Sequence, residues 1–318
     1  MKEKITFRQL IQYADPETEP EIMIQIVVDD EEWDRATELW VGSPLLKPFM
    51  DYVVDEIGYS ALADVKIGVP NDTTNEARAL LLLQELGYIT VDPNAGITAT
   101  IGDITENPYN IEFEEVEAAQ IPNILPDVDF GIINSNYAIP AGLNPAEDAL
   151  EQEGSASAYV NILCVKEGNE NSPEAKALAA ALGSKVVADY FAATYAGSAI
   201  SVVENPGDGY DASVDYAALA GTTISVAASP SPHAEVLALA KDILAAKNIT
   251  LDIIEFTDYV QPNMVVESGE VFANYFQHVP YLNDFNAQNG THIVTVAGIH
   301  VEPMGIYGGK QASLDAIK

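Results

Sequence analysis

The chain has 318 residues, enough for two domains that each bury a core of their own. Forty-nine acidic residues against fourteen basic ones give a formal net charge of −35. This balance argues strongly against nucleic acid or an anionic membrane surface as a partner, because both need Lys and Arg to neutralise phosphate. The acidic residues are spread along the chain, which is typical of a solvated surface, with cation binding as the less favoured alternative.

Cysteine content and hydropathy limit the class of protein further. Cys164 is the only cysteine, so an intramolecular disulfide and a cysteine zinc site are both impossible. No apolar stretch reaches the roughly 18 residues of a membrane span. Met1 to Lys4 leads into an amphipathic segment, so we expect neither an export signal nor a lipid-anchor cysteine near the start of the chain as given.

Residues 1–62 are predicted to form a small α+β module. Residues 6–13 have helical spacing and residues 21–28 alternate as a strand. Both tryptophans, Trp33 and Trp40, lie here. We find no catalytic or metal-ligand spacing in this segment, and its role is unknown.

From Val65 onward the pattern becomes strands alternating with helices. A strand over 66–69 is followed by a capping turn, residues 70–75, and a helix over 76–86. The free N–H groups at such a helix start suit a carboxylate, and Arg78 could add a two-pronged hydrogen bond to it. An ordinary cap with a surface arginine fits the local pattern equally well.

The next segments continue this alternation. We predict strands over 111–117, 129–134 and 158–166, and two helical segments within 172–195 that break near Gly183. The second of these strands ends in Asn134-Ser135-Asn136-Tyr137, and polar side chains at the end of a buried strand are candidates for a ligand site.

Residues 204–221 have the composition of a linker, and a second α/β run begins after them. It comprises a strand over 223–228, a helix over 234–247, a strand over 251–256 and a loop that carries Tyr259. The last strand, 292–307, contains Glu302-Pro303, which suits a crossover between lobes better than the interior of a strand.

Ala273 to Leu282 is the stretch that points most directly to a ligand site. A strand over 271–276 and a helix through 281–289, with Pro280 in its first turn, would place Phe276, His278 and Tyr281 at a strand-to-helix turn. Ligands of open α/β sheets bind at the carboxyl ends of strands. Alternatively, these rings are a lid on the core and the imidazole is an ordinary hydrogen-bonding group.

No sequence motif for catalysis is present. GxGxxG, GxxxxGK[ST], GxSxG and HExxH are all absent, and no nucleophile has a base beside it. We therefore expect a protein that is not an enzyme, with no catalytic residue, no metal site and no cofactor.

Five motifs together resemble the methionine-binding lipoproteins of the NlpA/MetQ family, the substrate-binding subunits of ABC methionine importers. The resemblance covers about 65–200 and 223–318. The motifs are Phe256–Asn263, Ala273–Leu282, Val301–Tyr307, Val69–Asn75 with Arg78, and Ile133–Ala138.

The resemblance implies an α/β fold of the two-lobed periplasmic-binding-protein type (type II), which closes on L-methionine or a related small amino acid and delivers it to an ABC permease. It also implies an extracytoplasmic, membrane-anchored protein. Within the motifs, the family implies a pocket for the thioether lined by Tyr259, Phe276, His278 and Tyr281. The α-carboxylate and α-amino groups would be held by Arg78, Asn75 and Asn134, and the ligand-binding set is completed by Asn71 and Asn274.

The order of the segments departs from the family. There, the counterpart of 223–318 precedes that of 66–200, so this chain resembles a circular permutation in which residues 204–221 join the usual termini. A slice from a tandem duplication would look the same. We therefore expect a lobe II at 63–156 and a lobe I at 157–318, with the 1–62 module added.

Two other functions stay open. The ligand cleft could be vestigial in a scaffold or interaction protein that displays residues 1–62, or His278 could serve a hydrolase or transferase. The sequence does not separate L-methionine from its D-isomer or from a methionine dipeptide.

Overall fold

The computed structural model describes residues 65–154, 159–195 and 197–317. They belong to one compact unit, Asp64–Lys318. The module expected at residues 1–62 lies outside the described residues.

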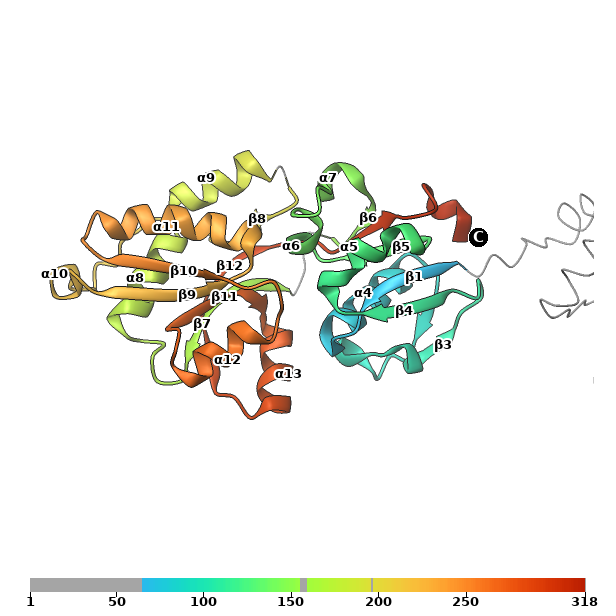
Figure 1. Cartoon of the computed structure of the whole chain (residues 1–318), viewed down its shortest axis with the longest axis horizontal. Helices are drawn as coiled ribbons and strands as arrows, with labels where there is room; N and C mark the ends of the chain where they lie inside the picture. The colour runs from blue at the N-terminus through green and yellow to red at the C-terminus, as the bar shows by residue number, and fades with distance from the viewer. Residues whose placement is uncertain (1–64, 155–158, 196, 318) are drawn as a thin grey trace, which may run out of the picture. The chain divides into compact units, whose positions relative to one another are not determined.

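The described chain is a mixed α/β structure built around two sheets (Figure 1). The first has the strand order β4-β1-β5-β13-β6. In it β1 runs parallel to β4 and β5, whereas β13 is antiparallel to β5 and β6. Its strands are β1 (Lys66–Pro70), β4 (Glu112–Val116), β5 (Phe130–Ile133), β6 (Ala149–Gln152) and β13 (Gly305–Gly308). A separate pair joins β2 (Thr90–Val91) and β3 (Ile104–Glu106).

Helices cover both faces of the first sheet. Alternate residues of β1, Ile67 and Val69, are buried in the cluster that includes the apolar side of α4 (Thr73–Glu85). The residue between them, Gly68, faces α5 (Ile121–Ile124) instead, because successive side chains of a strand point to opposite faces. A Cβ atom at Gly131 would lie 2.9 Å from Leu125 Cδ1. The glycine in β5 therefore lets α5 and the residue after it, Leu125, approach the sheet closely.

The second sheet has the order β10-β9-β11-β7-β12-β8. The first three strands are parallel, and β7, β12 and β8 continue the sheet with antiparallel pairings. Its strands are β7 (Val160–Lys166), β8 (Ile200–Ser201), β9 (Thr223–Ala228), β10 (Thr250–Glu255), β11 (Ala273–His278) and β12 (Ile293–Val301).

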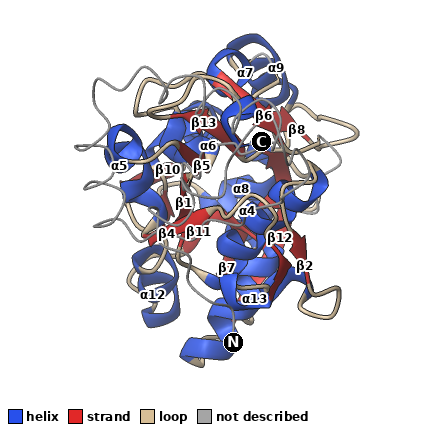
Figure 2. Cartoon of the chain, turned by 90° about the vertical axis from the view of Figure 1, so that its right-hand side faces the viewer, coloured by secondary structure: helices blue, strands red, loops and turns tan. Residues whose placement is uncertain are grey.

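Strand β7 shows why this sheet is covered on both sides. Leu163 and Val165 pack into one core cluster, and Ile162 and Cys164 pack into another. A continuous apolar run is typical of a strand buried on both faces. The first cluster lies under α8 (Pro173–Leu182), α9 (Lys185–Thr194) and α11 (Glu235–Ala245), and the second under α12 (Gln261–Ser268) and α13 (Val279–Asn289). Both views place α9 on the opposite side from α12 and α13 (Figures 1 and 2).

The chain crosses between the sheets after β12. The segment expected as one strand over 292–307 is divided into β12 and β13, with Glu302, Pro303 and Met304 between them. Pro303 has no N–H to donate to a ladder, which ends the pairing there. Since β13 pairs with β5 and β6, the chain after the crossover belongs with the first sheet and not with the second. This differs from the expected lobe at 157–318, while the division into lobes itself stays a prediction.

The segment at 204–221 is more ordered than its linker composition suggests. It contains the short helix α10 (Tyr216–Leu219), and the Tyr210 hydroxyl donates to the Ile243 carbonyl at 3.0 Å. Lys247 Nζ lies 4.5 Å from the centre of the Tyr210 ring. The segment is therefore packed against α11 and the turn after it.

Two further short α-helices are α6 (Ser135–Ala138) and α7 (Pro145–Asp148). A turn over Pro230–Ala234, with extended backbone at Ser231, precedes α11. Within the ranges that the structure describes, no helix is both long and apolar enough to cross a membrane.

Candidate functional site

A cavity lies where the carboxyl ends of β1, β5 and β11 approach one another. From the first sheet it receives residues of α4 and of the β5–α6 turn. From the second it receives residues of β7, β11 and α13, together with the loop before α12. The crossover contributes Glu302. The lining residues are Asn75, Arg78, Asn134, Ser135, Asn136, Asn161, Tyr259, Phe276, Gln277, His278, Tyr281 and Glu302.

One wall of the cavity is a cluster of aromatic rings from the second sheet. The centre of the Tyr259 ring lies 5.9 Å from that of Phe276 and 5.8 Å from that of Tyr281. Phe285 packs behind Tyr281 at 5.9 Å. The Tyr281 hydroxyl donates to the Tyr259 carbonyl at 2.8 Å, which fixes the two rings relative to each other. Such ring edges suit a polarizable thioether, at about 0.3 to 1.5 kcal/mol per sulfur contact.

The opposite wall, from the first sheet, carries amide side chains. Asn134 Nδ2 donates to Asn75 Oδ1 at 2.9 Å, and the Tyr259 hydroxyl donates to Asn136 Oδ1 at 2.7 Å. The other polar atoms of these amides, Asn134 Oδ1 and Asn136 Nδ2, are buried and have no hydrogen-bond partner among the described residues. Leaving a buried polar group unpaired costs about 1 to 3 kcal/mol. One acceptor and one donor are therefore left for a ligand.

Arg78 brings a buried positive charge to the same side. Its guanidinium donates to both carboxylate oxygens of Glu153, from Nε at 2.7 Å and from Nη2 at 2.5 Å. Nη2 also donates to the Glu302 carbonyl at 2.7 Å, and the carbon at the centre of the guanidinium lies 4.4 Å from the centre of the Tyr159 ring. We expected this guanidinium to bind the carboxylate of a ligand. In the structure it already binds the carboxylate of Glu153.

His278 ends β11 and begins α13. Its Nδ1 accepts the backbone N–H of Tyr281 at 3.2 Å and so caps the helix, while its Nε2–H faces Asn75 Oδ1 at 3.5 Å. Burial, followed by the nearby charge of Arg78, holds the pKa of His278 well below its usual 6.5. The imidazole is therefore neutral near pH 7.

We expect His278→Ala to lower the free energy of unfolding by about 1 kcal/mol, because the helix cap is removed. His278→Asn keeps a side-chain acceptor at this position and should recover most of that difference. Urea unfolding of the two variants measures it, and equal destabilisation would mean that the cap does not matter. We also expect His278→Ala to weaken ligand binding less than Arg78→Ala, because a neutral imidazole contributes mainly contact.

The structure brings most of the expected ligand-binding residues together. The exceptions are Asn71, which is exposed, and Asn274, which is buried away from the cavity and donates to Asn263 Oδ1 at 2.8 Å. Neither lines the cavity. Asn71 lies one residue before the helix cap, and Asn274 points to the face of β11 opposite its neighbours Ala273 and Tyr275.

Other lining residues were not in the expected ligand-binding set. Asn136 belongs to the polar run after β5 that the strand-end argument made a candidate, but only Asn134 of that run was assigned to the ligand. Asn161 is the second residue of β7, and nothing in its local pattern distinguishes it. Glu302 was noticed only for its place at the crossover.

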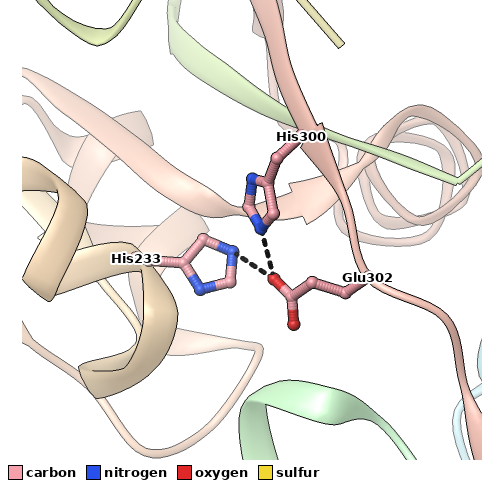
Figure 3. A group of neighbouring side chains, drawn as sticks. All are labelled: His233, His300 and Glu302. Carbon is pink, nitrogen blue, oxygen red and sulfur yellow. Dashed lines mark hydrogen bonds and ion pairs between the residues drawn. The ribbon is translucent and has the colours of Figure 1, made fainter. Parts of the chain in front are cut away.

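A compact group of imidazoles and a carboxylate lies beside the cavity (Figure 3). Glu302 Oε1 is 2.5 Å from His300 Nε2 and 3.3 Å from His233 Nε2. His233 Nε2 is also 2.9 Å from Asn161 Oδ1, and the Tyr275 hydroxyl is 2.6 Å from His300 Nδ1. The two histidines and Glu302 are all buried.

Comparison with known proteins places the chain in a family. The family described as NlpA lipoprotein matches residues 55–203 and 224–318, which is more than half of the chain. The chain belongs to the NlpA lipoprotein family. The unmatched residues between the two segments nearly coincide with the stretch at 204–221 that contains α10.

Curated relatives of this NlpA-family chain have names that refer to lipoproteins. It is 42% identical over 139 residues to membrane lipoprotein TpN32 of Treponema pallidum, covering 44% of this chain and 52% of that protein. It is 37% identical over 169 residues to the probable D-methionine-binding lipoprotein MetQ of Vibrio cholerae, covering 52% and 63%. The chain thus spans between half and two thirds of the length of these relatives.

Among solved structures, a nutrient-binding protein from Burkholderia cenocepacia bound to methionine is 41% identical in the aligned part. The alignment covers 42% of this chain and 57% of that one, with a TM-score of 0.41.

Proposed function

We propose that this chain is a substrate-binding protein that captures methionine, or a closely related small amino acid, between the units built on its two sheets. An ABC permease would be the acceptor, and an extracytoplasmic, membrane-anchored location would follow from the same assignment. Membership of the NlpA lipoprotein family and the D-methionine-binding name of the Vibrio cholerae relative support this.

The observation that carries the proposal is the polarity of the cavity. Three rings near the second sheet, those of Tyr259, Phe276 and Tyr281, line one wall. The first sheet supplies an unpaired acceptor, an unpaired donor and a guanidinium on the other. An amino acid with an apolar side chain has matching ends: its ammonium can donate to Asn134 Oδ1, and its carboxylate can accept from Asn136 Nδ2 and Arg78. The thioether of methionine would then lie against Tyr259, Phe276 and Tyr281.

Contacts across the cavity support closure around a ligand. The Tyr259 hydroxyl bonds to Asn136, the Tyr137 hydroxyl donates to the Thr257 carbonyl at 3.2 Å, and His278 Nε2 faces Asn75. Each of these bonds joins a residue near the first sheet to one near the second. Hinge motion about the crossover strands would open and close the cavity.

Calorimetric titration tests the proposal directly. We expect one molecule of L-methionine to bind per chain. L-norleucine, which replaces the sulfur by a methylene, should bind more weakly by about 0.3 to 1.5 kcal/mol for each ring that the sulfur touches. Titration with D-methionine and with a methionine dipeptide decides between these ligands. If none of them gives binding heat, the proposal is wrong.

One observation favours a second function. Because Glu153 already pairs with Arg78, the cavity could be satisfied internally, as in a scaffold that keeps a vestigial cleft. The same titration separates the two: Glu153→Gln frees the guanidinium and should preserve or strengthen methionine binding if the site is active. If the cleft is vestigial, neither the parent chain nor this variant binds.

We further propose that the chain is a circular permutation of the family order. Both ends of the described unit support this, because Val65 and Ile317 are buried in the same core cluster. A chain rearranged to place 224–318 before 66–203 should form the same two sheets. A crystal structure of that chain with different strand pairings would contradict the proposal.

A further inference from the structure

We propose that His233, His300 and Glu302, with Asn161 as a fourth ligand, form a binding site for a divalent transition-metal ion of the Zn²⁺ class. The site lies beside the ligand cavity and shares Glu302 and Asn161 with its lining.

The donor atoms converge on one point. The ligand atoms of His233, His300 and Glu302 all lie within 4.8 Å of one another, and Asn161 Oδ1 is 2.9 Å from His233 Nε2. Imidazole nitrogen and carboxylate oxygen are usual ligands of Zn²⁺, at about 2.0 to 2.2 Å. Tetrahedral bonds of that length set neighbouring ligand atoms roughly 3.3 Å apart. The His233–Glu302 distance is already 3.3 Å, whereas His300 would have to withdraw by less than about 1 Å.

The other ring nitrogens allow each Nε2 to become a metal ligand. For that, the proton of a neutral imidazole must lie on Nδ1, where an outer partner normally accepts it. His300 Nδ1 faces the Tyr275 hydroxyl at 2.6 Å, and a hydroxyl can accept as well as donate. His233 Nδ1 is buried with no side-chain partner among the described residues, and the Ser231 backbone is the hydrogen-bonding group beside this imidazole, so a proton on Nδ1 displaces no side chain.

The rings are held in place before any ion binds. His300 stacks on Phe191 with 4.7 Å between ring centres, and His233 packs edge-on against Tyr275 at 4.8 Å. Ligands fixed by packing lose little freedom on coordination. Glu302 and Asn161 both line the cavity, which gives an ion a route to the site.

Charge also favours a cation here. The Glu302 carboxylate is buried, and the two side chains that lie against its Oε1 are the imidazoles of His300 and His233, not a lysine or an arginine. The nearest guanidinium, that of Arg78, bonds to the Glu302 backbone carbonyl and directs its fork at Glu153. A divalent ion would neutralise the carboxylate directly. The competing interpretation is a closed hydrogen-bond network of the same atoms with no affinity for metal.

Nitrogen NMR of histidine separates these interpretations, because the whole chain contains only four histidines: His233, His278, His292 and His300. The full chain is treated with chelator and titrated with Zn²⁺ in excess Mg²⁺, which occupies the acidic surface. We expect the Nε2 signals of His233 and His300 to shift together and saturate at one equivalent. A shift of His292 alone, or no shift at all, would overturn the proposal.

Substitution provides the matched control. His300→Gln should weaken Zn²⁺ binding about 100-fold, measured by competition with a chromogenic chelator, whereas His292→Gln should not change it. His292 is a suitable control because it is 63% exposed and also lies near a carboxylate, that of Glu267 at 3.4 Å. Should His300→Gln fail to fold, Co²⁺ absorption of the unsubstituted chain decides: tetrahedral bands support the site, and an octahedral aquo spectrum counts against it.

Discussion

Replacing Arg78 by alanine is expected to weaken L-methionine binding by about 2 to 5 kcal/mol, or roughly 30-fold or more. The guanidinium is 4% exposed and lies in the cavity wall, so its removal would leave the ligand carboxylate desolvated without a cation. Calorimetry of the variant measures the change. An unchanged affinity would show that Arg78 serves only the structure, through Glu153.

The same substitution should also destabilise the folded chain. Removing one partner of a buried ion pair typically costs about 3 to 5 kcal/mol, because the other charge stays buried. Glu153 would keep only the backbone N–H of Met304, at 2.9 Å, among the bonds that the structure describes for its side chain. Binding must therefore be measured well below the unfolding transition of the variant.

Two further variants sharpen this test. Lys66→Ala removes a cation of comparable size from the exposed pair with Glu114, where the side chains are 39% and 47% exposed. It should change neither binding nor stability measurably. Arg78→Lys keeps the charge but not the planar fork, so we expect binding between that of the parent and that of the alanine variant.

Lowering the pH from 7 to 5 is expected to reduce the free energy of unfolding by about 2 to 4 kcal/mol. Burial lowers the pKa of His233 to about 4 and that of His300 to about 3, and that of His278 lies well below 6.5. Below pH 6.5 these histidines are therefore protonated in the unfolded chain but stay neutral in the folded chain. The free energy of unfolding falls as the pH falls through this window. At pH 5 His233 and His300 each contribute about 2 kcal/mol to this decrease, and His278 acts in the same direction.

Glu302 opposes part of the effect. Burial raises the pKa of its carboxyl, so the folded chain takes up that proton more readily than the unfolded one and gains stability as the pH falls. His233→Gln should flatten the pH dependence. Both tryptophans, Trp33 and Trp40, precede the unit Asp64–Lys318, so tryptophan fluorescence would not report on the unfolding of its sheets. Stability is therefore measured by peptide-resolved hydrogen exchange of β7 and β11. A stability that stays constant between pH 7 and 5 would contradict the prediction.

The sequence predicted the elements with strong local signals. Strand β9 occupies the expected residues 223–228, and the expected break near Gly183 separates α8 from α9, with Ser184 capping the second helix. Pro280 lies in the first turn of α13, as its fixed φ and missing N–H favour. These features depend on residues only a few positions apart, so a single sequence contains enough information for them.

The candidate site was predictable only in part. Tyr259, Phe276, His278 and Tyr281 were found because strand-to-helix turns carry ligands in α/β sheets. The pairing of Arg78 with Glu153 joins residues 75 positions apart, and His233 bonds to Asn161 across 72 positions. No periodicity or spacing reports such contacts, because they are set by how the sheets pack. The sequence did not predict that β13 belongs to the first sheet, for the same reason.

The position of Cys164 gives this chain a chemical reporter of its own opening. The thiol is fully buried in β7, between β11 and β12, and burial raises its pKa, so it is inert while the sheet is closed. Because it is the only cysteine in 318 residues, a thiol reagent can add just one label per chain. The labelling rate then reports how often β7 separates from β11 or β12 and exposes the thiol. A ligand that holds the closed form should slow that rate in proportion to its occupancy, which turns an unmodified side chain into a kinetic assay for binding.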